Sequence, residues 1–274
     1  MIRINPKAPR ILPSGYKDFD DYFKILSGSC TIFYVSNQTY WDAVGLLGRW
    51  ASNLFDDEFN ISISTRFDLI TVIRMALERM PDIVERISFT AKEGKAYWID
   101  MYSAKGLSEE MKKDFIEEYN QKLKSFGIDS LILYMVKNPE KSSSINEVNS
   151  FIKEIMGRVP KNMMGRIFVS IGDDFVDAWG MGTFLEFFKN QVDILLHKFH
   201  HTGIYSISYK NYLKKFHARI ERMADNILLW GYDEEKEEKY MQILKSPIIG
   251  SFFGKVLYKM NEKMLPEFKP RKNF

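Results

Sequence analysis

The sequence predicts an α/β protein of three layers, in which helices cover both faces of a mostly parallel central sheet. Several short apolar runs, rich in β-branched and aromatic residues, lack the polar alternation of half-exposed strands, which favours strands buried on both faces. Segments with helical spacing separate most of these runs, so the strands are joined by crossovers and run parallel. The last strands follow one another directly, and we expect them to pair antiparallel.

The first half of the chain begins with a strand followed by a helix and then repeats this order. The run Cys-Thr-Ile-Phe-Tyr-Val-Ser at 30–36 is continuously apolar, and the segment 40–55 repeats apolar residues at helical spacing. Ser108 precedes a charged helix that ends at Gly127, an arrangement typical of a serine N-cap and a glycine after the last turn. Strands are expected over 30–36, 60–64, 95–102 and 130–136, and helices over 19–26, 40–55, 68–79, 109–126 and 145–156.

The second half continues the pattern and then changes it. The run Arg-Ile-Phe-Val-Ser-Ile at 166–171 is again apolar without alternation, so we expect it near 30–36 at the centre of the sheet. A charged turn joins the apolar run 226–232 to 238–244, which is typical of an antiparallel pair. Strands are expected over 166–171, 203–208, 226–232, 238–244 and 253–260, and helices over 184–199 and 212–223.

The composition of the chain excludes several classes of protein. The chain has 274 residues without a visible linker or repeat, so we expect one domain over 1–274, with an extended lead-in at 1–28 and a basic tail at 261–274. A hydrophobic content of 45% excludes a disordered chain, and a single cysteine excludes an intramolecular disulfide framework. The net charge of +3 is too small for a strongly basic nucleic-acid-binding surface. No apolar run reaches the roughly 18 residues of a membrane span, and we expect a cytoplasmic protein with no membrane partner.

The turn after the first strand lies where a mononucleotide-binding domain keeps its phosphate loop. Such a loop uses glycines to turn backbone N–H groups toward the phosphates, and it uses a lysine and a Ser or Thr to meet phosphate and Mg²⁺. This turn contains no glycine and no lysine, and its two aromatic rings would crowd the phosphates. We therefore expect a degenerate phosphate-loop position, although a helix N-terminus still attracts an anion. Its residues are Ser36, Asn37, Gln38, Thr39, Tyr40 and Trp41.

Acidic residues follow two of the expected strands. Asp173 and Asp174 come directly after Gly172 at the end of the run 166–171, a position suited to holding Mg²⁺ in an open α/β sheet. Asp100 is a second acid of this kind, at the end of the strand expected over 95–102. The alternative for each is that it caps the following turn or helix.

The histidines and the cysteine give weaker signals. His197 and His201 are four residues apart and could face one metal, with His200 beside them. Histidines at the end of a helix also complement its dipole, and we favour that role and expect no metal site. Cys30 lies in an apolar run with no base beside it, so we expect a buried, inert thiol.

Two stretches near the ends of the chain carry a family resemblance. Ala224 and Asp225 lead into two expected strands, the second of which closes on Lys245. Near the start, the stretch Ser-Gly-Tyr-Lys-Asp-Phe-Asp at 14–20 precedes Gly28 and the first strand. These features resemble the KaiC- and RadA-like branch of the RecA-fold P-loop ATPases. The resemblance implies a RecA-like three-layer α/β/α fold.

The departures from that branch bear on activity. In the branch, the closing lysine is followed two residues later by an arginine, and both reach the nucleotide of the neighbouring subunit. Here Lys245 is kept, but Pro247 stands at the arginine position. Asp173 would take the place of the strand-end magnesium acid, in a register that Gly172 leaves open. The chain thus resembles a degenerate, archaeal-type member of the branch with no cofactor, and its many Lys and Glu residues fit a thermophile.

We therefore expect a non-catalytic pseudo-ATPase that acts as a regulatory or scaffolding protein. It would form a homo-oligomer, or pair with a RecA-like relative, through residues 243–260. The first alternative is an enzyme that binds a nucleotide or other phosphorylated ligand through Asp173, Asp174 and Lys245. The second is a DNA- or RNA-associated accessory factor. The Lys-Pro-Arg-Lys stretch at 269–272 is a local basic patch, and we expect it to be a solvated chain end rather than a binding arm. The apolar cluster behind the partner prediction consists of Ile243, Leu244, Pro247, Ile248, Ile249, Phe252 and Phe253.

Overall fold

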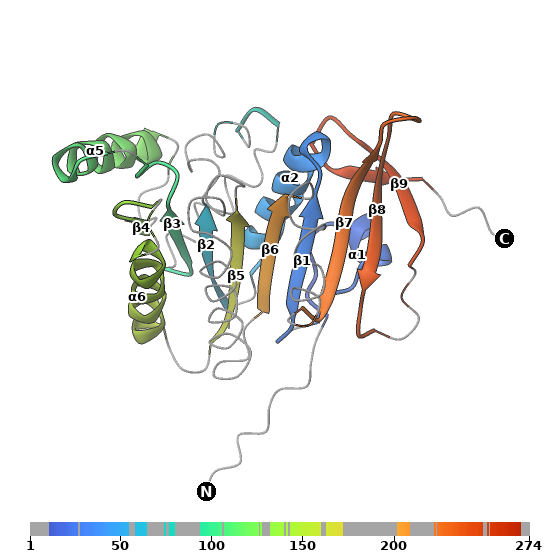
Figure 1. Cartoon of the computed structure of the whole chain (residues 1–274), viewed down its shortest axis with the longest axis horizontal. Helices are drawn as coiled ribbons and strands as arrows, with labels where there is room; N and C mark the ends of the chain where they lie inside the picture. The colour runs from blue at the N-terminus through green and yellow to red at the C-terminus, as the bar shows by residue number, and fades with distance from the viewer. Residues whose placement is uncertain are drawn as a thin grey trace, which may run out of the picture.

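A mixed sheet forms the centre of the protein in the computed structural model. Among the described residues it has ten strands, in the order β10-β9-β8-β7-β1-β6-β5-β2-β3-β4. Helices lie along both of its faces (Figure 1). The structure describes residues 11–26, 28–54, 58–64, 74, 77–79, 94–105, 107–125, 127, 132–139, 141, 143–159, 163–171, 202–208, 222, 224–248, 251 and 253–269.

The parallel part of the sheet surrounds β1 (Cys30–Val35), whose residues are all buried. β1 pairs in parallel with β6 and β7 on its two sides, and the parallel pairing continues outward from β6 to β4. Only β6 separates β1 from β5, so the prediction that the runs 30–36 and 166–171 lie near each other at the centre is confirmed. The remaining parallel strands are β2 (Glu58–Ser64), β3 (Ala96–Asp100), β4 (Ile132–Met135), β5 (Met164–Ile171), β6 (Thr202–Ser208) and β7 (Asn226–Asp233).

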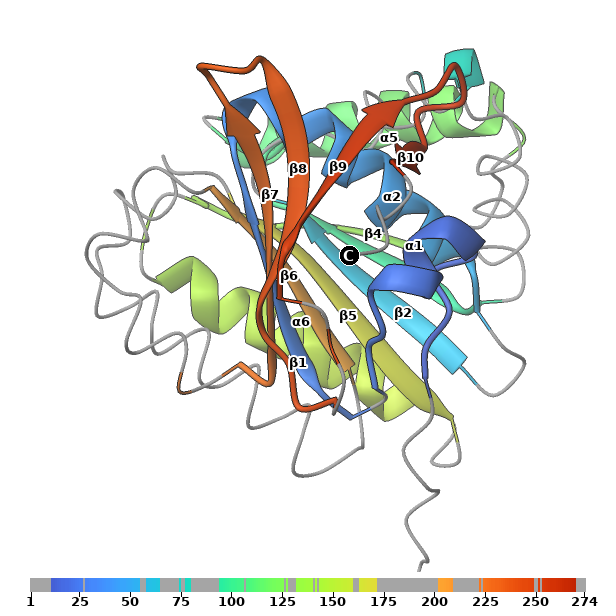
Figure 2. The same ribbon diagram turned by 90° about the vertical axis from the view of Figure 1, so that its right-hand side faces the viewer.

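Two hydrophobic cores separate the three layers. On one face, α1 (Lys17–Tyr22) and α2 (Tyr40–Ser52) pack on the sheet around Phe33 and Trp50. On the other face, α6 (Ser143–Arg158) packs with Ile152 against the strands. The edge-on view shows α6 on one side of the sheet and α1 and α2 on the other (Figure 2). This is the predicted three-layer arrangement.

One polar helix borders the sheet near β4. α5 (Glu109–Ser125) begins where the Ser108 hydroxyl accepts a hydrogen bond from the Met111 N–H at 3.2 Å. It ends before Gly127, whose positive φ of 76° suits a glycine. The predicted cap and stop of this helix are confirmed. The helices expected over 184–199 and 212–223 lie almost wholly outside the described residues.

The antiparallel strands close the opposite edge. β8 (Glu238–Lys245) pairs antiparallel with β7 and with β9 (Lys255–Met260), as predicted. The expectation of a basic tail over 261–274 was wrong in part, because β10 (Pro266–Phe268) adds a further antiparallel strand to β9. The Phe268 ring lies 5.1 Å from that of Tyr22, so this end of the chain covers α1. The lead-in likewise belongs to the core, since Phe19 is fully buried.

The sheet also holds the carboxyl end of α2. The guanidinium of Arg166 in β5 donates to the Asn53 carbonyl at 2.9 Å and forms a buried ion pair with Glu58 of β2. Carbonyls at the end of a helix have no partner within the helix, and a cation there is favourable. Arg166 therefore orients α2 so that the beginning of this helix points to the carboxyl ends of the strands.

Candidate functional site

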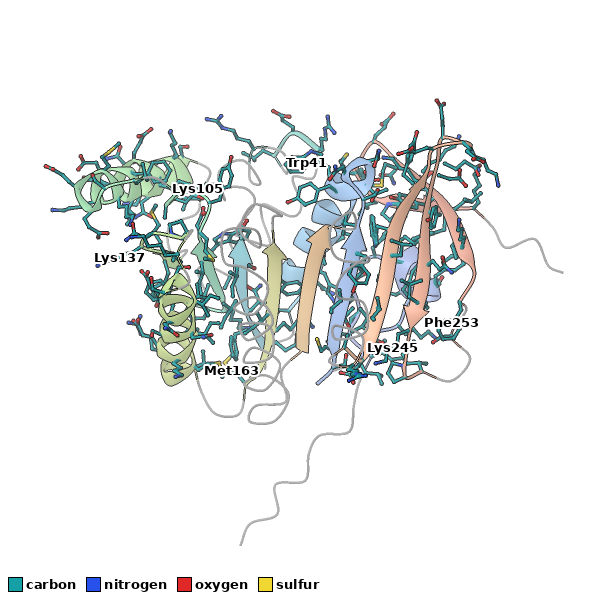
Figure 3. All side chains as sticks on the ribbon, in the orientation of Figure 1. Trp41, Lys105, Lys137, Met163, Lys245 and Phe253 are labelled. Atoms are coloured by element: carbon teal, nitrogen blue, oxygen red, sulfur yellow. The ribbon has the colours of Figure 1, made fainter. Side chains whose placement is uncertain are left out.

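Residues 36–41 comprise the link between β1 and α2 and the first two residues of α2. The carboxyl ends of the parallel strands, where they lie, are the usual ligand-binding edge of an open α/β sheet. Trp41 is seen at this edge, above the strand ends (Figure 3). Asn37, Gln38 and Trp41 are exposed, whereas Thr39 and Tyr40 are buried.

Donor groups of this turn are bonded to carbonyls of the protein. η1, a 3-10 turn over Asn37–Thr39, together with Ser36 forms the whole link between β1 and α2. The Ser36 N–H donates to the Trp230 carbonyl at 3.0 Å, and the Thr39 hydroxyl donates to the same carbonyl at 2.9 Å. The Thr39 N–H donates to the Ser36 carbonyl at 3.2 Å. Two N–H groups of the turn are thus directed to carbonyls of the protein.

The two aromatic residues of the turn have different surroundings. Tyr40 is 5% exposed and belongs to the core between α2 and the sheet. Trp41 is 41% exposed, and its ring lies 5.1 Å from that of Tyr40. Tyr40 therefore helps to fix the start of α2, and Trp41 presents an indole ring at the carboxyl edge.

Asp42, in the first turn of α2, is a buried acid that sequence reasoning missed. Its carboxylate forms an ion pair with Lys239 at 2.9 Å and accepts a hydrogen bond from the Tyr258 hydroxyl at 2.8 Å. Burial, followed by the nearby Asp42 carboxylate, raises the pKa of Tyr258 well above its usual range, so the phenol stays a donor. An acid at the start of the helix is a visible signal, but nothing in the sequence links it to Lys239 and Tyr258.

Of the predicted strand-end acids, the structure describes Asp100 but not Asp173 or Asp174. Asp173 and Asp174 lie outside the described residues, although β5 ends at Ile171, just before them. Asp100 is fully buried and accepts hydrogen bonds from the N–H and the hydroxyl of Ser103, at 2.8 and 2.7 Å. Asp100 thus caps the turn after β3, which is the alternative that the sequence left open.

Lys245 lies at the other end of the sheet from the turn. It closes β8, as the sequence predicts, and pairs with Ile227 near the start of β7. Its ammonium donates to the Ala224 carbonyl at 2.6 Å. Trp41 and Lys245 are seen at opposite edges (Figure 3), so the structure does not bring Lys245 to residues 36–41.

Asp225, one of the residues that carry the family resemblance, pairs with the first strand at this amino edge. The Asp225 carboxylate accepts the Cys30 N–H at 2.8 Å, and the Asp225 N–H donates to the Cys30 carbonyl at 2.9 Å. The Asn226 amide donates to the hydroxyls of Ser29 and Thr31 at 3.2 and 3.1 Å. These bonds start the β1–β7 pairing, so the Ala-Asp pair and its neighbours have a structural role here.

The other candidates show no sign of chemistry in the described part of the chain. Cys30 is buried, and burial raises the pKa of its thiol well above its usual range, as expected for an inert thiol. His197, His200 and His201 lie outside the described residues. Within the described ranges, no three His, Cys, Asp or Glu side chains gather to hold a metal ion. The helices described there are too short or too polar to cross a membrane.

The fold is RecA-like. Neither a protein-family model nor a curated protein sequence matches the chain. Among solved structures, the chain is similar to a KaiC-like protein from the hyperthermophilic archaeon Pyrococcus horikoshii OT3, with 13% identity and a TM-score of 0.56. The match covers 96% of this chain and 100% of that one. The predicted RecA-like α/β fold is thereby confirmed, while identity this low carries the architecture and not an activity.

Proposed function

We propose that this chain is a RecA-like domain that does not use ATP and acts as a non-catalytic regulatory or scaffolding protein. The closed link between β1 and α2 is the observation that carries the proposal. In a nucleotide-binding domain, this link wraps its backbone N–H groups around phosphates. Here the Ser36 and Thr39 N–H groups, together with the Thr39 hydroxyl, donate to carbonyls of the protein instead.

Charge at the site adds to this argument. A phosphate loop offers a lysine to the β- and γ-phosphates, and residues 36–41 contain none. The first turn of α2 instead holds Asp42, whose ion pair with Lys239 already uses a cation near the site. A triphosphate placed here would meet one buried carboxylate and would have to displace protein hydrogen bonds. Both effects oppose binding.

The enzymatic alternative has less support. It needs Asp173, Asp174 and Lys245 to act on one phosphorylated ligand. Lys245 lies at the amino edge and donates to the Ala224 carbonyl, whereas Asp173 and Asp174 lie outside the described residues. Lys245 thus lies at the opposite edge of the sheet from residues 36–41, where a phosphate-binding turn would be expected.

Thermal unfolding with Mg²⁺ and ATP tests the proposal. A ligand with a dissociation constant above roughly 1 mM, added at about 1 mM, stabilises a protein by less than about 0.4 kcal/mol. We expect no measurable shift of the midpoint with ATP. Inorganic triphosphate with Mg²⁺ is the matched control, because it separates phosphate binding from recognition of the nucleoside. A rise of several degrees with ATP would overturn the proposal.

A scaffolding protein needs a contact surface, and we place it within residues 243–260, with a second copy of the chain as partner. Ile243 belongs to the core with α2, and Leu244 packs on the core of the other face, so neither is available. Phe253 is 50% exposed, and its carbonyl accepts a hydrogen bond from the Gln242 amide at 3.0 Å. Phe253 lies at the same edge as Lys245 (Figure 3). The contact therefore centres on Phe253.

Light scattering across a concentration series tests this contact. We expect a dimer that Phe253→Ser dissociates. Met111→Ser is the matched control, since Met111 is 56% exposed on α5, outside the proposed surface. A wild-type chain that stays monomeric at every concentration, or an equal response to both variants, would refute self-association through Phe253.

A further inference from the structure

The start of α2 is joined to the antiparallel edge of the sheet through one carboxylate. Asp42 lies in the first turn of α2 and is 4% exposed. Its two partners come from different strands, Lys239 from β8 at 2.9 Å and Tyr258 from β9 at 2.8 Å. Tyr258 is itself only 2% exposed. A helix near the start of the chain and two consecutive strands near its end therefore meet at a site that is largely shielded from water.

Asp42 lies at the end of α2 where a helix favours a nearby anion. The first N–H groups of a helix have no partner within the helix and carry a partial positive charge, which favours an anion nearby. In proteins that bind phosphate at such an end, the ligand supplies the anion. Here the chain supplies a carboxylate of its own, which is paired with the Lys239 ammonium. The first turn of α2 thus already holds a buried anion of the protein, where a phosphate-binding domain would hold its ligand.

We propose that Asp42, Lys239 and Tyr258 form a ligand-independent clamp that makes α2 and the strands β8 and β9 one cooperative unit. When β9 loosens, the Asp42 carboxylate loses a donor while it is still buried, and this cost is relieved only if the start of α2 also opens. Opening of the helix in turn leaves the Tyr258 hydroxyl buried without its acceptor. Each side therefore stabilises the other.

The clamp goes beyond the proposed non-catalytic function, because it concerns the isolated chain and needs neither ATP nor a partner. It also links two surfaces. Trp41 is next to Asp42 at the carboxyl edge, and β9 lies within the residues 243–260 proposed for the partner contact. Binding of a partner at residues 243–260 would therefore change the surroundings of Trp41 through the clamp.

Hydrogen exchange of Tyr258→Phe tests the clamp from its far side. The substitution removes one hydroxyl and keeps the ring, which packs 5.5 Å from that of Trp230. We expect amide protection in residues 43–50 of α2 to fall about tenfold or more, the size expected for a lost hydrogen bond to a charged group. Tyr102→Phe is the control, since it removes a hydroxyl from a residue that is 43% exposed, and it should leave α2 unchanged.

The reciprocal variant completes the test. Asp42→Asn should lower the protection of residues 255–260 in β9. The double variant should lose little more than the larger single variant, because both remove the same interaction. If Asp42→Asn does not fold, the Tyr258→Phe result decides alone. Unchanged protection of α2 in Tyr258→Phe, or additive losses in the double variant, would overturn the clamp and leave the ATP-independent function untouched.

Discussion

Arg166 and Glu58 form a buried ion pair beneath the carboxyl end of α2. Their side chains are 2% and 1% exposed, and Arg166 also donates to the Asn53 carbonyl. Arg166→Met leaves a buried carboxylate without its cation and a helix end without its donor. We expect the free energy of unfolding to fall by about 3–5 kcal/mol, measured by urea denaturation.

An exposed arginine provides the matched comparison for this variant. Arg158 pairs with Glu154 one turn earlier on α6, and its side chain is 56% exposed. Water screens such a pair, so Arg158→Met should cost about 0.5 kcal/mol or less. Equal losses for the two variants would mean that the Arg166 pair does not anchor α2.

At the residue scale, local chemistry was predictable and long-range partners were not. The inert character of Cys30 and the capping alternative for Asp100 could both be stated from neighbouring residues. Asp42 could not be singled out, because its importance comes from Lys239 and Tyr258, which only the folded sheet brings to it. A carboxylate in the first turn of a helix is common, and its burial is what distinguishes this one.

The 3-10 turn η1 is the element on which the closed site depends. The Thr39 hydroxyl is buried and donates to the Trp230 carbonyl. Thr39→Val keeps the shape and removes this bond, so we expect a loss of about 1–2 kcal/mol in stability by chemical denaturation. Gln38→Ala, at an exposed position of the same turn, should change stability by less than about 0.5 kcal/mol. A Thr39→Val variant as stable as Gln38→Ala would show that the turn is not held in this way.

At the element scale, apolar runs in the sequence predicted most strands. A strand that forms only through tertiary packing could not be predicted in this way. The predicted strands over 30–36, 166–171 and 226–232 agree closely with β1, β5 and β7. β10 was missed, because a three-residue strand that begins with a proline has no periodicity to detect. It forms because β9 offers a partner and Phe268 packs against Tyr22.

Buried phenols give the whole molecule a characteristic response to alkaline pH. Burial and the Asp18 carboxylate raise the pKa of Tyr16 to about 12, and burial raises the pKa values of Tyr97, Tyr134, Tyr240 and Tyr258 from the usual 10.0. Between about pH 10 and 12 the folded chain then holds more protons than the unfolded chain, so stability falls as pH rises.

Urea denaturation at a series of alkaline pH values measures this response. We expect the unfolding midpoint to be steady below about pH 10 and to fall above it. Tyr16→Phe should reduce the slope between about pH 10 and 12. A midpoint that rises over this interval would contradict the burial of these phenols.

At the scale of the whole molecule, the three layers could be predicted from patterns that repeat along the chain, and the RecA-like fold followed from the resemblance of two stretches near the chain ends to the KaiC- and RadA-like branch. The function could not be predicted to the same extent. One architecture of this kind serves many activities. The feature that carries the proposed function is a short link of a few residues at the end of β1, whose hydrogen bonds depend on the distant carbonyl of Trp230.

Isothermal titration calorimetry of the wild-type chain with ATP and Mg²⁺ tests the central claim most directly. A link without glycine or lysine, closed by protein hydrogen bonds and followed by a buried Asp42, should leave ATP with a dissociation constant above roughly 1 mM, or at most about 4 kcal/mol of binding free energy. The titration should then show only the heat of dilution. Binding at micromolar concentration would contradict the account, because it would require the turn at residues 36–41 to open around the phosphates.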